Sequence, residues 1–436
     1  MLSSRRNRPE LPADTATFEG GATMNAHHPC FDPRHAATAR RIHLPVAKNC
    51  NIQCRFCNRL YDCVNEQRPG VTSVLLAPKQ ALLYLERMID AMGDIDVVGI
   101  AGPGDAFADP DVTIETLDLV HNKFPSIALC VSTNGLMIAN FAAQLAKLGV
   151  THASVTINAV DTTICEQIID WVHFEKKTLR GKEAAQTLIR RQREAVISLH
   201  EAGIIVKVNT IVISGINEAH IASIAAVAKQ SGADVHNCMP FMPVAGSQFE
   251  KLQAPDHDSM QKARWGASRH LPQVRHCNRC RADAAGILGH DDPAAAAILR
   301  DCASLPRDPS QKRPYIAVAS REGALVNEHV GKADNFYVYC RADSGIELVD
   351  VRPAPPPGGL LERWRNLSRI LHDCRILCAS QIGEPPKAVL EDEGITVVIT
   401  EGLISETVSA LFEGRSVPRP IFLKPCTGSS QGGGCL

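Results

Sequence analysis

Long apolar runs are missing from this chain of 436 residues, and no stretch approaches the ~20 residues that a membrane-spanning helix needs. An excess of charge of either sign is missing too. The formal net charge is −1, so no basic field favours nucleic acid or an anionic membrane surface as a partner. An export signal is also absent, because Pro, Asp and Thr follow Arg5 and Arg6 where an apolar segment would be required. These absences predict a cytoplasmic protein with no membrane and no nucleic-acid partner.

The order of apolar segments predicts an α/β protein. Short β-branched runs alternate with longer amphipathic stretches, which is typical of a parallel sheet with helices outside. About six such units indicate a partial or full β/α barrel, whose reactive residues lie at the C-terminal ends of the strands. The expected strands are 42–46, 97–101, 127–132, 153–158, 204–213 and 234–240, and the clearest helices are 78–92, 111–123 and 184–202.

The length predicts two or three domains at roughly 100–200 residues each. A polar, disordered leader is expected over 1–25, and the barrel domain with its further ligand residues over 26–300. A charged, proline-bearing linker follows at 301–312, and a smaller α/β domain with mixed strands and helices at 313–412. The stretch 413–436 ends in a Gly/Ser-rich segment and is expected to be a flexible tail, with Cys426 and Cys435 as passengers.

Cysteine is abundant, with 16 residues. In a long chain without an export signal, a reducing cytosol favours metal ligation by thiolates over disulfides. Some of these cysteines lie in apolar-periodic segments and are expected to be core residues instead, namely Cys165, Cys340, Cys374 and Cys378.

The strongest motif is Cys50-Asn-Ile-Gln-Cys54-Arg-Phe-Cys57, directly after an expected strand. Three thiolates on one loop can each bind one iron of a [4Fe-4S] cluster, which leaves the fourth iron without a protein ligand. An open iron can chelate S-adenosylmethionine (SAM), and electron transfer then yields a 5′-deoxyadenosyl radical, chemistry that belongs to the cofactor. A zinc site is the alternative, but the spacing is unsuitable and no matching C-x2-C pair is nearby. The motif therefore predicts a radical SAM enzyme.

Polar and glycine clusters after the next strands are candidates for binding SAM. Gly102, Gly104 and Asp105 follow the expected strand 97–101, where small residues let the backbone approach a ligand. Ser132, Thr133, Asn134 and Asn158 end the following two strands and are expected to meet the SAM carboxylate or ribose; ordinary turn chemistry is the alternative for each.

Further soft ligands exceed what one cluster needs. Cys130 ends an expected strand and should therefore point to the barrel mouth, and Cys277 and Cys280 close the barrel region. A structural zinc is the alternative for that pair, and a hydrogen-bonded strand histidine is the alternative for His43. Glu66 is a candidate proton carrier or a solvated loop carboxylate. The additional ligands make two sets of about three: Cys30, His43, Cys63, Cys130, Cys277 and Cys280.

On these residues the chain resembles the NifB family of radical SAM enzymes, which act in assembly of the nitrogenase iron–molybdenum cofactor. The resemblance covers the first three hundred residues, and the Asn58–Cys63 and Cys277–Ala284 runs are highly specific to that family. The region 313–412 resembles the NifX-like domain that many NifB proteins bear, which has an RNase H-like α/β sandwich fold. The matching stretches are 28–31, 50–70, 101–105, 132–135, 156–161 and 276–284.

The resemblance implies a reaction and a set of ligands. Two [4Fe-4S] substrate clusters are fused around a carbide into an eight-iron precursor, NifB-co. One SAM donates a methyl group to a cluster sulfide, a second yields the radical that abstracts hydrogen from it, and a ninth sulfur comes from sulfite. Cluster donors and cofactor carrier or scaffold proteins of nitrogenase assembly are the implied partners. Cys50, Cys54 and Cys57 hold the SAM cluster; one substrate cluster falls on His43 (or His28), Cys63 and Cys130, and the other on Cys30, Cys277 and Cys280.

One departure concerns the NifX-like domain, in which the family has His-Phe-Gly where this chain has His329-Val330-Gly331. No ligands are therefore assigned there.

Two other functions remain open at this point. A radical SAM enzyme with permanent auxiliary clusters would act on another substrate, and it would supply four protein ligands for each cluster. A non-catalytic iron–sulfur scaffold would fail to cleave SAM to 5′-deoxyadenosine.

Overall fold

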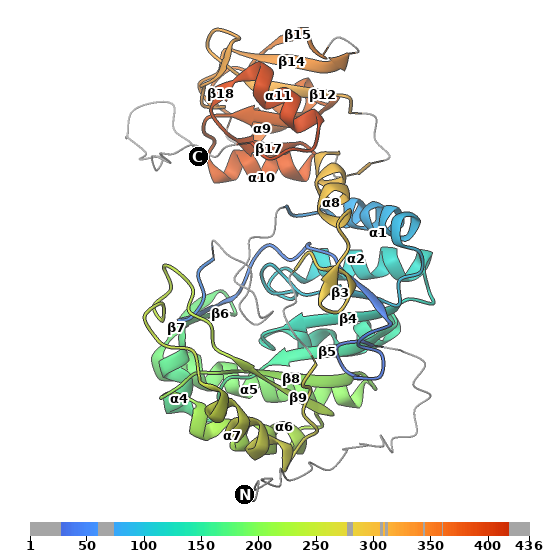
Figure 1. Ribbon diagram of the computed structural model, residues 1–436. Coiled ribbons are helices and arrows are strands. Elements are labelled where there is room, and N and C mark those ends of the chain that lie inside the picture. Colours follow the sequence, from blue (N-terminus) through green and yellow to red (C-terminus); the bar gives the residue numbers. More distant parts are fainter. Residues whose placement is uncertain are drawn as a thin grey trace, which may run out of the picture.

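The computed structural model describes residues 28–59, 74–276, 282–305, 308–309, 313–342, 345–359 and 361–417. Figure 1 shows two bodies, one above the other, with helix α8 (Ala295–Ser304) between them. The larger body is formed by the elements before α8 and the smaller body by those after it. Among the described residues, no helix has the length and apolar character needed to cross a membrane.

A parallel sheet forms the centre of the larger body. Its order is β11-β10-β1-β3-β4-β5-β8-β9, and each neighbouring pair from β1 to β9 is parallel. Within the described residues β9 and β11 are the two edges, so the predicted α/β barrel is the partial, open form. The strands are β1 (Arg40–His43), β3 (Val97–Ile100), β4 (Ala128–Thr133), β5 (Val150–Thr156), β8 (Ile205–Val212), β9 (Val235–Pro240), β10 (Ala285–Ile287) and β11 (His290–Asp291).

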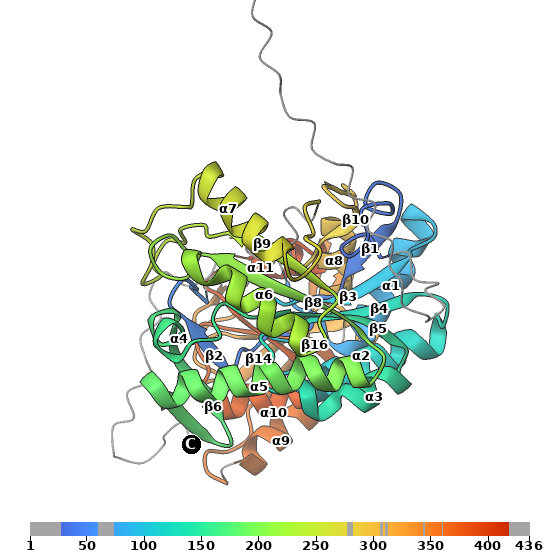
Figure 2. The ribbon, with the colours of Figure 1, turned by 90° about the horizontal axis from the view of Figure 1, so that it is seen from below.

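Helices cover the outer face of this sheet. In Figure 2, which views the molecule from below, α5 and α6 lie in front of the strands, and Figure 1 shows the same layering from the side. The helices are α1 (Pro78–Met92), α2 (Pro110–Lys123), α3 (Ala142–Lys147), α4 (Thr162–Ile168), α5 (Gly181–Glu201), α6 (Ile221–Gln230) and α7 (His257–Ser268), with 3-10 turns η2 (Ile138–Phe141) and η3 (Glu218–His220).

Local sequence explains why these elements begin, end and pack as they do. Helix α1 starts with Pro78, whose fixed φ suits the first turn, and the Gln80 side chain accepts a hydrogen bond from the Ala77 amide at 2.8 Å. The helix stops before Gly93, which has φ of +82°. Strand β3 is buried along its whole length, as expected for a parallel strand covered on both faces.

A small antiparallel sheet, in the order β2-β6-β7, lies beside the main one. It was not expected from the sequence, because its strands are short and interrupt the helical pattern. Its strands are β2 (Ile52–Cys54), β6 (Ile169–Phe174) and β7 (Lys177–Arg180).

The smaller body is an α/β sandwich around the sheet β15-β14-β12-β16-β17. Alternate residues of β12 face opposite layers: Ala317 and Ala319 pack with α9 and α10, whereas Ile316 and Val318 pack with α11. Its elements are β12 (Tyr315–Ala319), β13 (Leu325–Val326), β14 (Asn335–Ala342), β15 (Gly345–Pro353), α9 (Leu361–Ile370), β16 (Cys374–Ala379), α10 (Glu384–Asp392), β17 (Thr396–Ile399), β18 (Gly402–Leu403) and α11 (Ile404–Phe412).

The expected core cysteines are buried in three cases of four. Cys165 lies in the core of the larger body, and Cys374 and Cys378 lie on opposite faces of the smaller sheet. Cys340 is only partly buried.

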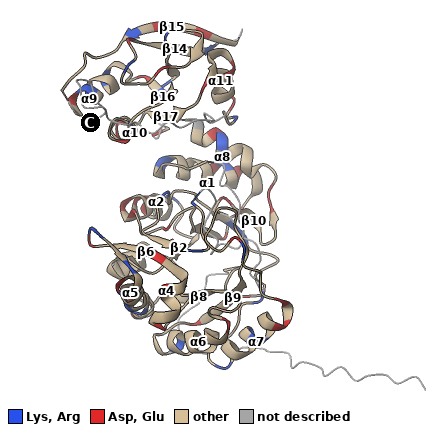
Figure 3. Cartoon of the chain, turned by 90° about the vertical axis from the view of Figure 1, so that its left-hand side faces the viewer, with Lys and Arg blue, Asp and Glu red and all other residues tan. Residues whose placement is uncertain are grey.

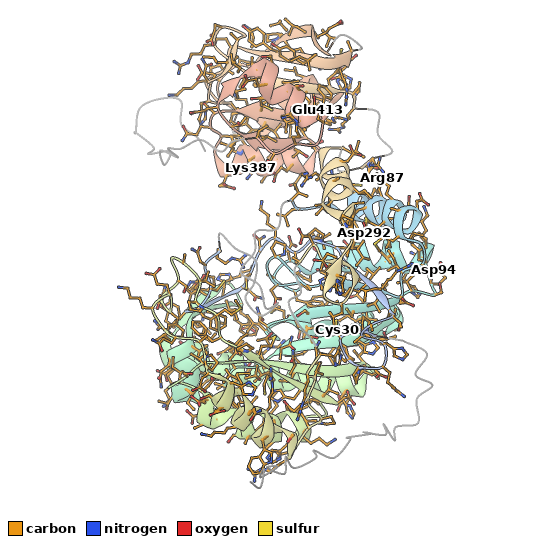
Figure 4. All side chains as sticks on the ribbon, viewed as in Figure 1. Cys30, Arg87, Asp94, Asp292, Lys387 and Glu413 are labelled. Carbon is orange, nitrogen blue, oxygen red and sulfur yellow. The ribbon has the colours of Figure 1, made fainter. Side chains whose placement is uncertain are left out.

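Helix α8 joins the two bodies. It packs against α1, and Arg87 of α1 forms an ion pair with Asp301 of α8; Figure 4 labels Arg87 at this junction. Lys79 and Asp308 form a second pair at 2.6 Å. The helix continues to Ser304, past the expected start of the linker at 301, because the apolar Leu299 and Cys302 are buried on one of its faces.

Charged residues of both signs are interspersed along both bodies in Figure 3. This mixture agrees with the near-zero net charge.

Candidate functional site

The loop of three cysteines is held by backbone and side-chain hydrogen bonds. Strand β2 pairs with β6, and the Cys57 amide donates to the Cys54 carbonyl at 3.0 Å, which makes a tight turn. The Gln53 amide group donates to the carbonyls of Cys54 and Cys57 at 3.0 and 2.9 Å. Cys50, Cys54 and Cys57 are all free thiols. These hydrogen bonds therefore fix the shape of the loop.

The three thiols line one pocket together with the C-terminal ends of three strands. Ala101 and Gly104 come from the loop after β3, Ser132 and Asn134 from the end of β4, and Thr156 from the end of β5. A second pocket shares Ile52, Cys54, Asn134 and Thr156 with the first and continues to Asn158 and Leu188. The strand ends thus bring together most of the residues expected to bind SAM. Gly102 is not among the lining residues.

Gly104 brings two backbones together. A Cβ atom at this position would lie 2.0 Å from the Asn49 carbonyl oxygen, so only glycine fits. The Gly104 amide donates to the Ala47 carbonyl at 2.6 Å, and the Asp105 amide donates to the Asn49 carbonyl at 2.7 Å. The glycine therefore fixes the loop after β3 against the cysteine loop, and it also lines the pocket.

The carboxylate of Asp105 also holds strand ends together. It accepts hydrogen bonds from the Thr133 hydroxyl at 3.0 Å and from the Asn134 amide at 2.5 Å. The Phe107 amide donates to it as well, at 2.9 Å. Burial raises the pKa of Asp105, although these donors oppose the rise. Asp105 lines the pocket but uses its oxygens to position β4 relative to β3.

Asn134 connects the sheet with the cysteine loop. Its side-chain amide donates to the Asn51 side-chain oxygen at 2.7 Å and lies 3.8 Å from the Cys50 sulfur. The Asn158 side chain has a different partner. Its oxygen accepts a hydrogen bond from the Ile211 amide at 2.8 Å, and this bond joins the end of β5 to β8. Asn51 was missed by sequence reasoning, because a polar residue inside the motif carries no separate signal.

The pocket has the chemistry of a site for a cluster and its ligand. Three thiols converge on it, and the buried Thr156 hydroxyl that lines it has no hydrogen-bond partner among the described residues. Burial raises the pKa of Cys50 to about 11, and Asp105 adds to the effect. Burial likewise raises the pKa of Cys57, opposed by Arg59. Metal binding must therefore displace thiol protons. On the donor set and the orphaned hydroxyl, a [4Fe-4S] cluster with SAM fits.

A second constellation lies deeper on the same face of the sheet. His43 of β1, Gly99 of β3, Cys130 of β4 and His152 of β5 are neighbours in one row across the strands. A Cβ atom on Gly99 would lie 2.9 Å from the His43 ring and 3.0 Å from the Cys130 sulfur. Because Gly99 has no side chain, the His43 ring and the Cys130 sulfur can both lie next to the space that its Cβ atom would occupy.

The expected position of Cys130 at the barrel mouth is wrong. Strand β4 continues to Thr133, so Cys130 lies inside the strand. Side chains two and four residues later, Ser132 and Asn134, reach the three-thiol pocket on the same face. Cys130 therefore lies below that pocket, about 7 Å and 13 Å along the strand from these two residues at ~3.3 Å per residue.

The N-terminal segment closes this deeper layer. Cys30 is 7% exposed and His28 is 2% exposed, and Figure 4 labels Cys30 against the strands of the larger body. The His28 ring lies 4.6 Å from both the His152 ring and the Phe31 ring. Lys207 of β8 donates to the Cys30 carbonyl at 3.3 Å, and its ammonium lies 4.6 Å from the centre of the Phe31 ring.

Burial dominates the protonation of the two histidines. It lowers the pKa of His28 well below its ordinary value, with His152, Lys207 and His43 adding to the effect. Burial, with a smaller effect of Lys207, lowers the pKa of His152 to about 3. Both rings are therefore neutral at physiological pH. His152 and Lys207 were missed by sequence reasoning. His152 lies beside Cys130 in the strand pairing, and the alternation of side chains along β8 places Lys207 on the same face of the sheet as Asn209.

Four predicted residues lie outside the described part of the chain: Cys63, Glu66, Cys277 and Cys280. Within the described ranges alone, no three His, Cys, Asp and Glu side chains are grouped closely enough to hold a single metal ion. This includes Cys50, Cys54 and Cys57, because each thiolate of a [4Fe-4S] site binds a different iron. The ligand sets proposed for the extra clusters each include residues outside those ranges.

Two family models match separate parts of the chain. Residues 44–228 match the radical SAM superfamily, and residues 312–414 match the dinitrogenase iron-molybdenum cofactor family. A solved structure of Streptococcus suis SuiB bound to S-adenosylmethionine is 14% identical and covers 53% of this chain and 50% of its own, with a TM-score of 0.39. That likeness is too remote to indicate a family or a function.

Curated relatives match almost end to end. The FeMo cofactor biosynthesis protein NifB of Chlorobaculum tepidum is 45% identical over 399 residues, which cover 91% of this chain and 94% of that protein. The NifB of Klebsiella pneumoniae is 37% identical and covers 88% and 89%, and that of Azotobacter vinelandii is 32% identical and covers 85% and 84%. The chain belongs to the NifB family of FeMo cofactor biosynthesis proteins, as a radical SAM protein with a C-terminal NifX-like domain.

Proposed function

We propose that this protein fuses two [4Fe-4S] substrate clusters into the eight-iron precursor of the nitrogenase cofactor, inserting a carbide derived from SAM and one additional sulfur. This reaction combines group transfer with radical chemistry, so the enzyme is of a lyase or transferase type. The observation that carries the proposal is the stacking of two soft-ligand layers on one face of the sheet: the three-thiol pocket above, and His43 with Cys130 below.

The upper layer is proposed to be the resident site. Cys50, Cys54 and Cys57 would hold a [4Fe-4S] cluster that, when bound, supplies the electron for reductive cleavage of SAM. Asn134 fixes the loop through Asn51, and the orphaned Thr156 hydroxyl offers a hydrogen bond to a ligand. Apolar side chains in the adjoining pocket would exclude water from a nucleoside bound there. They are Ile52, Ile168, Ile169 and Leu188.

The lower layer is proposed to bind the substrate clusters. His43 and Cys130, with Cys63, would hold one cluster, and Cys30, with Cys277 and Cys280, the other. Three ligands for each four-iron cluster leave an open iron, and clusters that must fuse and leave should be held by few bonds. Permanent auxiliary clusters would be served better by four ligands, so the small ligand sets favour substrates over fixed electron carriers.

The proposed partners follow from this role. Donor proteins must deliver four-iron clusters, and a carrier or scaffold protein of nitrogenase assembly must accept the product. We infer that the NifX-like domain, which is joined to the larger body through α8 and its contact with α1, takes part in that transfer.

The experiment is anaerobic reconstitution followed by iron quantitation and measurement of 5′-deoxyadenosine after addition of dithionite and SAM. Cys54→Ala should abolish SAM cleavage. Cys63→Ala and Cys277→Ala should each lower bound iron by about one four-iron cluster and leave the SAM cluster intact. Cys340→Ala, in the smaller body, is the matched control and should change neither quantity. Unchanged iron in Cys63→Ala and Cys277→Ala would refute the three-cluster arrangement, and wild-type protein that binds clusters without cleaving SAM would be a scaffold.

A further inference from the structure

His28 lies within the lower layer, although it comes from a segment outside the sheet. Its ring centre lies 4.6 Å from that of His152, with the two rings tilted, and His152 is the neighbour of Cys130 in the strand pairing. His43 is close enough to influence its charge. Only 2% of its surface is exposed, and its ring contacts are with Phe31 and His152.

A backbone hydrogen bond fixes which nitrogen of His28 carries the proton. The Cys30 amide donates to Nδ1 at 3.1 Å, and a backbone amide can only donate. Nδ1 must therefore present its lone pair to that amide. A neutral imidazole has one proton, so the proton is on Nε2.

The hydrogen on Nε2 has no acceptor in the described part of the chain. Nε2 is buried and lacks a hydrogen-bond partner there. Buried donors are almost always paired, because leaving one unsatisfied is costly. An acceptor outside the described residues is therefore expected at this point.

The surroundings of His28 select the kind of acceptor. Lys207 brings a positive charge into the same layer, where it contacts the Cys30 carbonyl and the Phe31 ring. The thiol of Cys130 and the ring of His43 converge beside Gly99. An anionic ligand rich in sulfur would accept the Nε2 hydrogen, attract the ammonium of Lys207 and offer metal atoms to Cys130 and His43. An iron–sulfur cluster is such a ligand, and hydrogen bonds to its sulfides tune its reduction potential.

We propose that His28 donates its Nε2 hydrogen to a sulfide of the substrate cluster held beside Cys130, and that it is not an iron ligand. This inference rests on the proposed function, and it assigns the histidine ligand of that cluster to His43. A nitrogen that bonds iron needs a free lone pair, and in His28 the lone pair of Nδ1 is already used by the Cys30 amide. His28 is thus a substrate-binding residue that places the cluster through a sulfide.

The test uses the full chain with Cys50, Cys54 and Cys57 replaced by alanine, so that the resident cluster does not contribute to the spectra. Reconstituted protein is reduced, and pulsed paramagnetic resonance measures nitrogen coupling from a histidine ligand and proton coupling that disappears in D2O. Iron content and midpoint potential are measured on the same samples. His28→Leu removes the donor, and His28→Gln keeps both an acceptor for the Cys30 amide and a donor. His173→Leu, on the exposed β6–β7 hairpin, is the matched control.

The expected result distinguishes a hydrogen-bond donor at His28 from an iron ligand. His28→Leu should retain the nitrogen coupling, lose an exchangeable proton coupling and lower the midpoint potential, while His28→Gln should restore both proton coupling and potential. His43→Ala should lose the nitrogen coupling. Loss of nitrogen coupling in His28→Gln with its retention in His43→Ala would make His28 the ligand and overturn the inference. Spectra and potential of His28→Leu identical to those of His173→Leu would overturn it as well. If the parent protein binds no cluster at all, the proposed function itself fails, and this outcome is seen before any histidine is changed.

Discussion

Gly99→Ala is the most informative single substitution, because it adds one methyl group between the two proposed ligands of the lower layer. The new Cβ would lie 2.9 Å from the His43 ring and 3.0 Å from the Cys130 sulfur, whereas ordinary contact begins at 3.4 Å. The φ angle of Gly99 lies outside the left-handed range, so alanine is compatible with the backbone. The conflict is thus confined to His43 and Cys130.

The magnitude follows from two opposing terms. Overpacking of a core costs about 1–3 kcal/mol, and replacing glycine by alanine in a compatible conformation returns about 0.4–1 kcal/mol through the unfolded chain. The net loss of stability should be about 1–2 kcal/mol. For a domain of this size that corresponds to about 2–4 °C in Tm for each kcal/mol. The variant should therefore remain folded at room temperature.

Gly99→Ala should impair cluster binding and product formation much more than it lowers the free energy of unfolding. Displacing His43 and Cys130 should lower bound iron and abolish formation of the eight-iron product, while the resident site continues to cleave SAM. Iron quantitation, 5′-deoxyadenosine measurement and thermal unfolding by circular dichroism provide the three readouts. Gly266→Ala is the control, because its Cβ would meet only Ala222 at 3.5 Å and alanine favours helix α7. Full iron loading and product formation by Gly99→Ala would refute the assignment of the lower layer.

Three further predictions concern other parts of the molecule. Cys54→Ala should reduce 5′-deoxyadenosine formation to background, measured by chromatography, without a change in the far-ultraviolet circular dichroism spectrum. Gly104→Ala should displace the cysteine loop, because its Cβ would meet the Asn49 carbonyl oxygen at 2.0 Å, and should therefore lower SAM-dependent spectral change as well as Tm. The Arg352 guanidinium lowers the pKa of Asp373, so this pair stabilises the smaller body above the unfolded pKa of about 3.9 and the contribution is lost as the pH falls through the folded value. Arg352→Met should cost about 1 kcal/mol at pH 7 and much less at pH 3 in denaturant unfolding, and an equal cost at both would contradict this origin.

The sequence predicted the main sheet well, because parallel strands buried on both faces are continuous apolar runs. Strand β9 (Val235–Pro240) was expected at 234–240, and helix α1 (Pro78–Met92) was expected with the same bounds. The small sheet of β2, β6 and β7 was missed. Strand β2 has three residues and lies inside the cysteine motif, so its pairing with β6 depends on residues more than a hundred positions away.

The sequence predicted which residue types form the candidate site better than it predicted where their side chains lie. The spacing of Cys50, Cys54 and Cys57 predicts that they hold the cluster, because three thiols on one loop suit an iron cluster, and the structure brings them to one pocket. The depth of Cys130 could not be read from the sequence, since the C-terminal limit of β4 decides which residue reaches the mouth. The partnership of His28 with the Cys30 amide was equally hidden, because a local hydrogen bond of this kind leaves no pattern of spacing.

The central claim is that the two stacked layers act on one product. Reconstituted protein is incubated anaerobically with dithionite and SAM labelled with carbon-13 in its methyl group, and the iron–sulfur product is examined by pulsed paramagnetic resonance. A carbon-13 coupling is expected in the product of the wild-type protein, and none is expected with Gly99→Ala. Continued formation of 5′-deoxyadenosine by the wild-type protein, with no labelled carbon in any iron–sulfur species, would contradict the central claim.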